Sequence, residues 1–254
     1  MLQPVRIRTP ESVEELGKYE ADIYVVAAFG QILSRQILEM PRYGCLNIHA
    51  SLLPKYRGAA PINQCIIDGE RETGVTIMQM DAGIDTGDIL TQKKVIIEDK
   101  ETAETLFDKL AQTGASLIVE TLPLIERGEI TPVKQDESLA SHVRMMDKGM
   151  GRIDWTSDAA AIERLVRGLN PWPTVYTTCQ GKTIKIWKSD AILTDGGENT
   201  EKPGTIVAVA KDFFDVACGT GILRVYELQP EGKKRMDTKS FLLGNQWKVG
   251  MLLG

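Results

Sequence analysis

The stretch CLNIHASLLPKYRGAAP, residues 45–61, holds one of the two histidines of the chain. It opens with a short apolar run, and Asn47 and His49 then stand two positions apart. An extended backbone points both of these side chains to one face. Pro54 and Pro61 then interrupt regular structure and predict a loop. A strand that ends in a loop beside an amide and an imidazole is a candidate active-site edge, and a structural Asn–His pair is the alternative.

The segments around this stretch alternate between strand and helix. DIYVVAA (22–28) is apolar and rich in β-branched residues, which predicts a strand buried on both faces, as in a parallel sheet. GVTIMQM (74–80) and ILTQKKVII (89–97) predict further strands, and residues 102–127 predict a long helix. Shorter elements are predicted at residues 5–8 (strand) and at 9–18, 34–40 and 61–69 (helices). We therefore expect a doubly wound, mainly parallel, Rossmann-like α/β domain over residues 1–128.

The character of the sequence changes after this domain. Residues 129–150 are polar and irregular and predict a linker. Residues 151–254 begin with a helical pattern and continue, over 175–228, as short β-rich runs broken by glycines and polar turns. Several short strands at such spacing predict a small β-barrel, and we expect a second domain there.

Composition limits the possible functions. The chain has 254 residues, a formal net charge of −5 and a pI near 5.3, which argues against a protein that coats nucleic acid with bulk positive charge. Its four cysteines are far apart and form no C-x-x-C pair, so we expect neither a metal site nor a disulfide framework, and a reducing compartment. We find no long apolar stretch and no signal sequence, and we expect a cytoplasmic protein without membrane contact.

His49 is the natural centre of any chemistry, because imidazole exchanges protons near neutral pH. The turn DAGIDTGD (81–88) lies between two predicted strands and offers a carboxylate, which we expect at the same carboxyl edge of the sheet. Asn47 can donate a hydrogen bond to a carbonyl oxygen that becomes an oxyanion. No serine or cysteine is set up as a nucleophile, and none is needed if the attacking group is itself an amine. This set of side chains suits acyl transfer to an external nucleophile.

NIHASLLPKYRGAAPI (47–62) followed by DAGIDTGDIL (81–90) resembles the signature of the folate-dependent formyltransferases. Five further stretches resemble the members of that family that act on initiator methionyl-tRNA; they are FGQILS (29–34), GRIDW (151–155), GLNPWP (168–173), TIKIW (183–187) and LQPEGKKRM (228–236). The resemblance implies a formyltransferase domain followed by an OB-like barrel that helps to grip tRNA. It also implies transfer of formyl from 10-formyltetrahydrofolate to the α-amino group of methionine on initiator tRNA.

The resemblance assigns roles to individual positions. Asn47, His49 and Asp85 match the catalytic trio, in which the first two polarise the formyl oxygen and Asp85 holds His49. Two roles are open for His49, as a base on the attacking ammonium or as a cation that stabilises the oxyanion throughout. The segments that match the folate pocket contain Phe29, Gly30, Gln31, Ile32, Leu33, Ser51, Leu52, Leu53, Pro54, Asp81, Ala82, Gly83 and Ile84. The basic residues that we would test for tRNA phosphate contacts are Arg144, Lys148, Arg152, Lys233, Lys234 and Arg235, although a single basic residue of this kind is more often simply solvated surface.

The start of the chain departs from the family pattern. Roughly the first sixty residues of that pattern are absent, and the first strand of a doubly wound sheet is central, so we expect strand 22–28 to have an exposed edge and the chain to be a fragment or a late-start reading. Two alternatives to the enzyme follow: a weakly active or inactive chain that still binds tRNA, and a hydrolase or dehydrogenase that removes formyl from the same folate. We expect a monomer.

Overall fold

The computed structural model describes residues 1–193 and 201–254. The chain forms two compact units. Unit 1 contains Met1–Ile62, Arg71–Ile97 and Phe107–Met145, and unit 2 contains Asn63–Glu70, Glu98–Leu106 and Met146–Gly254. Each unit is described by itself below. The domain limits expected at residues 128 and 150 stay a prediction.

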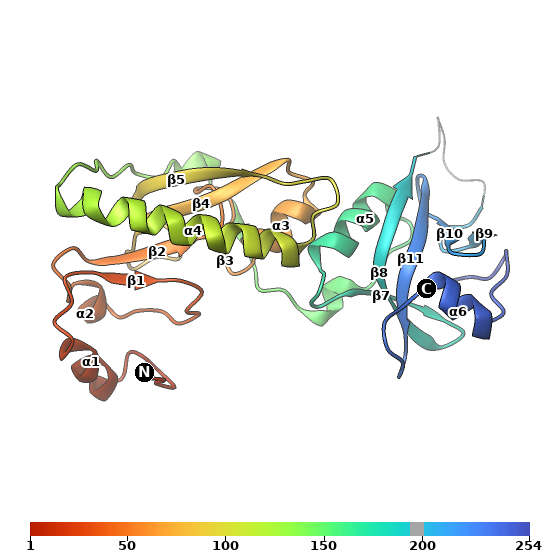
Figure 1. Cartoon of the computed structure of the whole chain (residues 1–254), viewed down its shortest axis with the longest axis horizontal. Helices are drawn as coiled ribbons and strands as arrows, with labels where there is room; N and C mark the ends of the chain where they lie inside the picture. Colours follow the sequence, from red (N-terminus) through yellow and green to blue (C-terminus); the bar gives the residue numbers. More distant parts are fainter. Residues whose placement is uncertain (194–200) are drawn as a thin grey trace. The chain divides into compact units, whose positions relative to one another are not determined.

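A four-stranded sheet with the order β1-β2-β4-β5 forms the centre of unit 1 (Figure 1). Its strands are β1 (Tyr24–Val26), β2 (Cys45–His49), β4 (Glu72–Gln79) and β5 (Ile89–Ile96). The expected α/β class is confirmed. The sheet is mixed rather than mainly parallel, because only β1 and β2 run parallel, whereas β2–β4 and β4–β5 are antiparallel. Residues 80–88 alone connect β4 to β5, and a parallel crossover needs about a dozen residues or more.

The first residues differ most from the expected pattern. Residues 5–8 form no strand, and β1 is shorter than predicted, with Val25 44% exposed, so it is not buried on both faces. β1 lies at the end of the sheet, as expected for a strand with a free edge. Two helices follow the sequence closely: α1 (Pro10–Gly17) and α2 (Arg35–Leu38) begin after Thr9 and Ser34, whose side chains accept hydrogen bonds from backbone N–H groups of the first turn.

The two faces of the sheet are covered by different elements. Helix α4 (Ala103–Glu126) runs along one face (Figure 1), where a Cβ at Gly114 would lie 2.8 Å from a methyl group of Ile48. The other face carries Asn47 and His49, since neighbouring strand residues point to opposite sides. The loop after β2 covers this second face, where the backbone N–H of Leu53 donates to Oγ1 of Thr76, 3.1 Å away.

The segment expected to be a linker is bound to unit 1 up to Met145. We call residues 129–145 the strap. Val133 pairs with Ile89 of β5, and β6 (His142–Val143) pairs with β3 (Arg57–Gly58). A short 3-10 helix, Glu137–Leu139, lies between these contacts.

Unit 2 is built on an antiparallel sheet with the order β7-β8-β11-β10-β9, and β12 pairs with β11. These strands are β7 (Val175–Cys179), β8 (Lys182–Ile192), β9 (Ile206–Val209), β10 (Phe214–Ala217), β11 (Ile222–Pro230) and β12 (Met236–Asp237). Helix α5 (Ala159–Gly168) lies along β8 (Figure 1), and α6 (Thr238–Gly244) follows β12. The remaining elements are helix α3 (Pro61–Ile67) and the 3-10 helix Lys148–Gly151.

The last residues of the chain close the barrel of unit 2. The N–H of Leu253 donates to the carbonyl of Gly204 at the β9 side, and the N–H of Gly254 donates to Thr178 of β7, each at 2.9 Å. The two end strands are therefore bridged by the segment that contains these residues. The expected β-barrel after the α/β domain is confirmed.

Candidate active site

The structure brings together the three side chains of the expected trio. Nδ2 of Asn47 donates a hydrogen bond to Oδ1 of Asp85 over 3.3 Å, and Nδ1 of His49 lies 3.6 Å from Oδ2 of the same carboxylate. The backbone N–H of Gly58 donates to that Oδ2 at 2.8 Å. The His49 side chain is 6% exposed and that of Asp85 is 16% exposed. Both oxygens of Asp85 are therefore held, and the carboxylate lies between the amide and the imidazole.

The second ring nitrogen of His49 is fixed by the backbone. Nε2 lies 2.9 Å from the carbonyl oxygen of Tyr56. A carbonyl oxygen can only accept a hydrogen bond, so we assign the proton of the neutral ring to Nε2. Nδ1 is then the ring nitrogen that faces Asp85.

The turn that carries Asp85 approaches Asn47 and His49 from an unexpected direction. β4 is antiparallel to β2, with Gln79 opposite Leu46 and Thr76 opposite His49, so the turn after β4 starts at the amino end of β2. The expectation that this turn leaves from the same carboxyl edge is wrong, because that argument holds only for parallel strands. The turn folds back along the sheet instead, and Asp85 adopts a positive φ of 54°.

Two local interactions shape this turn. Oδ1 of Asp81 accepts hydrogen bonds from the N–H of Gly83 at 3.0 Å and from the hydroxyl of Thr86 at 2.7 Å. Gly87 is buried, and a Cβ there would overlap the carbonyl oxygen of Gln79. The turn thus needs glycine where it passes the end of β4.

We expect Gly87→Ala to displace the turn that carries Asp85. The added methyl group has no room beside the carbonyl of Gln79, and overpacking of this kind typically costs about 1–3 kcal/mol. Urea unfolding should show this loss, together with a lower kcat. Gly244→Ala is the matched control, because nothing lies within 4 Å of its added Cβ. Equal stability of both variants would contradict the close approach at Gly87.

The expected folate segment after β2 is part of the scaffold around His49. Ser51 is fully buried, and its hydroxyl donates to the carbonyl of Lys55 at 2.6 Å. Leu53 is 3% exposed, and its carbonyl accepts a hydrogen bond from the side chain of Gln92. Leu52 and Pro54 are partly exposed. The Ser51 hydroxyl is therefore engaged by the loop and not directed at the trio as a nucleophile.

The other two expected folate segments are more exposed. Residues 27–30 follow β1, which runs parallel to β2 with Val26 opposite Asn47, so this segment leaves the sheet at the end that carries His49. Phe29 and Ile32 are 41% and 67% exposed, whereas Leu33 packs into the core around α2. Gly30 is exposed, and the side chain of Gln31 accepts a hydrogen bond from the N–H of Ile7. In the turn after β4, the exposed residues are Asp81, Ala82, Gly83 and Ile84.

Cys45 stands in the same strand as Asn47 and is not a nucleophile. Burial raises the pKa of its thiol to about 11, so the thiol stays protonated at neutral pH. Its Sγ is within hydrogen-bond distance, 3.5 Å, of the carbonyl of Ile37. Within residues 1–193 and 201–254, no cluster of three or more His, Cys, Asp or Glu side chains could hold a metal ion.

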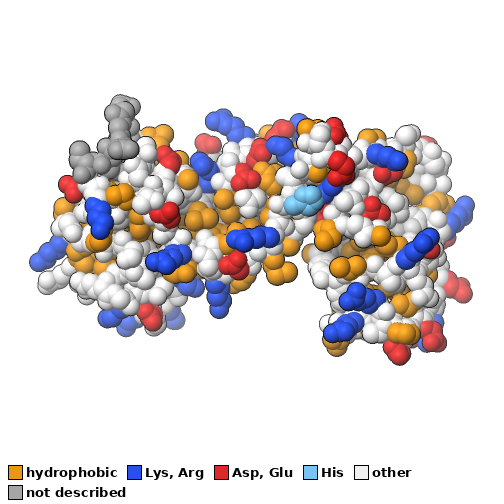
Figure 2. All heavy atoms as spheres, turned by 180° about the vertical axis from the view of Figure 1, so that it is seen from behind, with side chains coloured by type: hydrophobic (Ala, Val, Ile, Leu, Met, Phe, Trp, Pro, Cys, Tyr) orange, Lys and Arg blue, Asp and Glu red, His pale blue; other side chains and the backbone are white. Residues whose placement is uncertain are grey.

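The expected tRNA-binding residues are all exposed. Arg144 belongs to unit 1, and Lys148 and Arg152 belong to unit 2, so the structure does not define them as one surface. Lys233, Lys234 and Arg235 lie together in the turn between β11 and β12. Figure 2 shows Lys and Arg side chains spread among acidic and hydrophobic ones on the face seen there.

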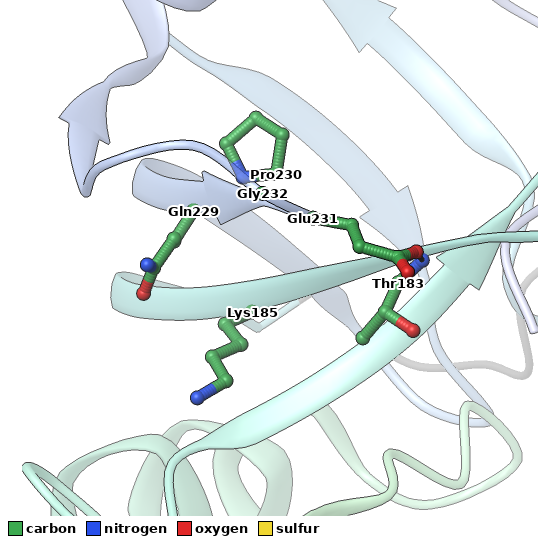
Figure 3. A pocket seen from close by; sticks show the side chains of 6 residues that line it. All are labelled: Thr183, Lys185, Gln229, Pro230, Glu231 and Gly232. Atoms are coloured by element: carbon green, nitrogen blue, oxygen red, sulfur yellow. Dashed lines mark hydrogen bonds between the residues drawn. The ribbon is translucent and has the colours of Figure 1, made fainter.

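Arg235 differs from its two lysine neighbours because its charge is already engaged. Its Nε lies 2.7 Å from Oε2 of Glu227, and its guanidinium lies over the ring of Trp187, 4.8 Å from the centroid. A small hollow of about 190 Å³ adjoins this turn, with Glu231 and Thr183 on one side and Lys185 and Gln229 on the other (Figure 3). The turn thus places Lys233 and Lys234 next to this hollow, and neither lysine forms an ion pair with another of the residues that the structure describes.

Sequence reasoning missed the strap. The side-chain nitrogen of Gln135 donates to the carbonyl oxygens of Asp85 at 2.8 Å and Gly87 at 2.7 Å. Arg57 in turn donates to Gln135 and forms an ion pair with Glu137. The polar run QDES (135–138) is the available signal, but a polar, irregular segment predicts a linker and no contact with the trio.

Two family models match this chain, one over its first part and the other over its second part. Residues 1–122 match the family described as "Formyl transferase", and residues 145–246 match "Formyl transferase, C-terminal domain". A protein named "Methionyl-tRNA formyltransferase" from Lachnospira eligens is 54% identical over all of this chain and 81% of its own length. Its namesake from Geobacter metallireducens is 50% identical over all of this chain and 80% of its own length.

Solved structures with lower sequence identity share the fold. HypX from Aquifex aeolicus, in complex with tetrahydrofolic acid, superposes with a TM-score of 0.68 at 18% identity, over 95% of this chain and 44% of the HypX chain. WlaRD, a sugar 3N-formyltransferase with 5-N-formyl-THF present, gives a TM-score of 0.65 at 22% identity, over 86% of this chain and 77% of its own.

Both family matches and the identity of 52–54% to two curated proteins, over 96–100% of this chain, indicate the same family. The alternative of a formyl-removing hydrolase or dehydrogenase is not favoured by these relatives. The chain belongs to the methionyl-tRNA formyltransferase family and is a transferase of that folate-dependent group.

Proposed function

We propose that this chain transfers the formyl group of 10-formyltetrahydrofolate to the α-amino group of methionine on initiator tRNA. The observation that carries the proposal is the single cluster of Asn47, His49 and Asp85, in which one carboxylate holds both the amide and the imidazole. Neighbours with the same fold are described with tetrahydrofolic acid or 5-N-formyl-THF. A cytoplasmic location and a monomeric state stay predictions, and none of the described helices is both long and apolar enough to cross a membrane.

The proposed chemistry uses the two hydrogens of the Asn47 amide. One is donated to Asp85, and the second can be donated to the formyl oxygen as it becomes an oxyanion. The amine nitrogen bonds to the formyl carbon, and the bond from that carbon to N10 of the folate then breaks. Nδ1 of His49 takes the proton lost by the amine, while Asp85 stabilises the resulting imidazolium. The His49 imidazolium then gives this same proton to N10 of tetrahydrofolate as the bond from the formyl carbon to N10 breaks, so protons and charges balance.

The proposed donor site lies around the face of β2 that carries Asn47. Support comes from the three segments that border this face or its ends: residues 29–33, 51–54 and 81–84. The exposed apolar side chains of the first and third segments, such as Phe29 and Ile84, suit contacts with a flat heterocycle. Calorimetric measurement of tetrahydrofolate binding to the full chain tests this part of the proposal by itself.

The decisive experiment is formyl transfer with the 254-residue chain. Charged initiator tRNA and 10-formyltetrahydrofolate should yield formylmethionyl-tRNA. Free formate without formylated tRNA would instead revive the hydrolase alternative. tRNA binding without turnover would support the weakly active chain that retains only tRNA affinity.

We propose Lys233 and Lys234 as tRNA phosphate contacts in unit 2. Each phosphate contact contributes to the salt dependence of binding, so the double replacement Lys233→Ala, Lys234→Ala should reduce the slope of log K against log salt by about 1–2. A salt titration of tRNA binding by fluorescence measures this slope. The matched control, Lys18→Ala with Lys94→Ala, removes the same charge from lysines paired with Glu15 and Glu72 in unit 1. Equal slopes for both double variants would contradict the assignment.

A further inference from the structure

We infer that Gln135 is a positioning residue for catalysis: from the strap, it holds the backbone of the turn that presents Asp85 to His49 and Asn47. The inference rests on the proposed function for its kinetic consequence. Its structural part concerns only unit 1, which contains every residue involved.

The geometry gives Gln135 two points of attachment on the turn. Its amide nitrogen carries two hydrogens. One hydrogen bond goes to the carbonyl oxygen of Asp85 at 2.8 Å and the other to that of Gly87 at 2.7 Å. The amide therefore spans the residues on either side of Thr86, and it fixes the backbone from which the Asp85 carboxylate projects.

The turn needs an external restraint at this point. Asp85 has a positive φ of 54°, a conformation that side-chain-bearing residues adopt at an energetic cost. The internal bonds of the turn come from Asp81, which holds Gly83 and Thr86 but not the Asp85 backbone. The two carbonyl contacts from Gln135 supply the restraint on the far side of the turn.

Gln135 is itself held by a buried cation. Nε of Arg57 donates to Oε1 of Gln135 at 2.9 Å. The other two guanidinium nitrogens bind Glu137 in a bidentate ion pair, at 2.9 and 2.7 Å. Arg57 is 1% exposed although it is charged, and its hydrogen bonds with Glu137 raise the pKa of its guanidinium and lower the pKa of that carboxyl. A buried guanidinium with all three nitrogens bound has little freedom, so it orients the Gln135 amide.

The strap also supports the other partner of the trio. The hydroxyl of Ser141 accepts a hydrogen bond from the N–H of Tyr56 at 2.8 Å, and the carbonyl of Tyr56 binds Nε2 of His49. One segment of the chain thus reaches Asp85 through Gln135 and reaches His49 through Ser141 and Tyr56. The strap therefore adds contacts on both sides of the pair formed by the Asp85 carboxylate and the His49 imidazole.

Hydrogen exchange measured by mass spectrometry tests the structural part on the full chain. Gln135→Ala should increase amide exchange in residues 81–88 while leaving peptides of unit 2 unchanged. Gln64→Ala is the matched control, since it removes a surface hydrogen bond to Asp68 and should leave residues 81–88 unchanged. Unchanged exchange of residues 81–88 in Gln135→Ala would overturn the inference, whether or not the chain has turnover.

A kinetic double-mutant cycle tests the functional part. Gln135→Ala should lower kcat about 10-fold, in line with misplacement of a catalytic group, with either KM changed less than about 3-fold. In the Asp85→Asn background, the same replacement should cost less than about 2-fold, because the group that it positions is already disabled. Equal losses in both backgrounds would show that Gln135 acts on general stability and would overturn the positioning role.

Gln135→Glu distinguishes the role of the amide oxygen of Gln135 from that of its amide nitrogen. It keeps an acceptor for Arg57 but replaces both donated hydrogen bonds with repulsion between oxygens. We expect it to be at least as impaired in kcat as Gln135→Ala, and wild-type activity in this variant would contradict the inference. If wild-type enzyme shows no formyl transfer, the proposed function fails, while the exchange experiment still decides the role of Gln135 in the turn.

Discussion

Replacement of His49 by alanine is expected to lower kcat for formyl transfer by about 10²–10⁴-fold, the usual contribution of a general acid or base. Imidazole is the side-chain group that most often serves as a general acid or base in enzymes, and the two nitrogens of His49 lie 2.9 Å from the carbonyl oxygen of Tyr56 and 3.6 Å from Asp85. The measurement is single-turnover formylation of charged initiator tRNA at saturating folate. Loss of turnover with folate binding retained would show that His49 acts in the chemical step.

The second histidine of the chain provides the control for this experiment. His142 is exposed in β6, where its backbone pairs with β3. His142→Ala removes the same side chain type and should leave kcat within about 2-fold of wild type, as for most surface substitutions. Comparable loss in both variants would argue against a specific role of His49. The melting temperatures of both variants separate chemistry from unfolding.

Replacement of Asn47 by alanine is expected to lower kcat by about 10²–10³-fold, the typical cost of one lost oxyanion-hole donor. Alanine removes the N–H proposed for the formyl oxygen and also the hydrogen bond to Oδ1 of Asp85. The Asn47 amide should bind the oxyanion of the transition state more strongly than the formyl oxygen of the bound substrate. The KM values should therefore change much less than kcat. Steady-state kinetics with both substrates give these two parameters separately.

A remote asparagine serves as the control for Asn47. The side chain of Asn245 donates to the carbonyl of Phe241 at the end of α6, in unit 2. Asn245→Ala should cost some stability of that helix end but leave kcat near the wild-type value. If Asn47→Ala lowered kcat no more than this control does, the oxyanion role would be wrong.

The sequence was sufficient to predict that Asn47, His49 and Asp85 lie together, and to predict much of the local structure. Asn47 and His49 stand two apart in a strand, and their separation from Asp85 matches a family signature, so no structure was needed to select them. Helices α1 and α2 were predictable because Thr9 and Ser34 are N-caps whose hydrogen bonds are local in sequence. These features depend on neighbouring residues or on a long specific motif.

Strand direction and the strap were not predictable by the same means. An apolar run such as residues 74–80 indicates a strand but not its direction, so the antiparallel pairing of β4 with β2 appeared only in the structure. Gln135 contacts Asp85 across 50 positions of sequence, and Arg57 contacts Glu137 across 80. Long-range hydrogen bonds of this kind leave no periodicity in the sequence, which is why a polar stretch was interpreted as a linker.

The bonds made by the strap determine where this enzyme can be divided. A catalytic fragment ending at residue 128, just after α4, would discard Val133, Gln135, Glu137 and Ser141 together with the barrel. It would thus remove Gln135 and Glu137, two side chains that the guanidinium of Arg57 binds. A transplantable catalytic module therefore has to extend at least to Met145, and a foreign acceptor-binding domain should be grafted after that residue.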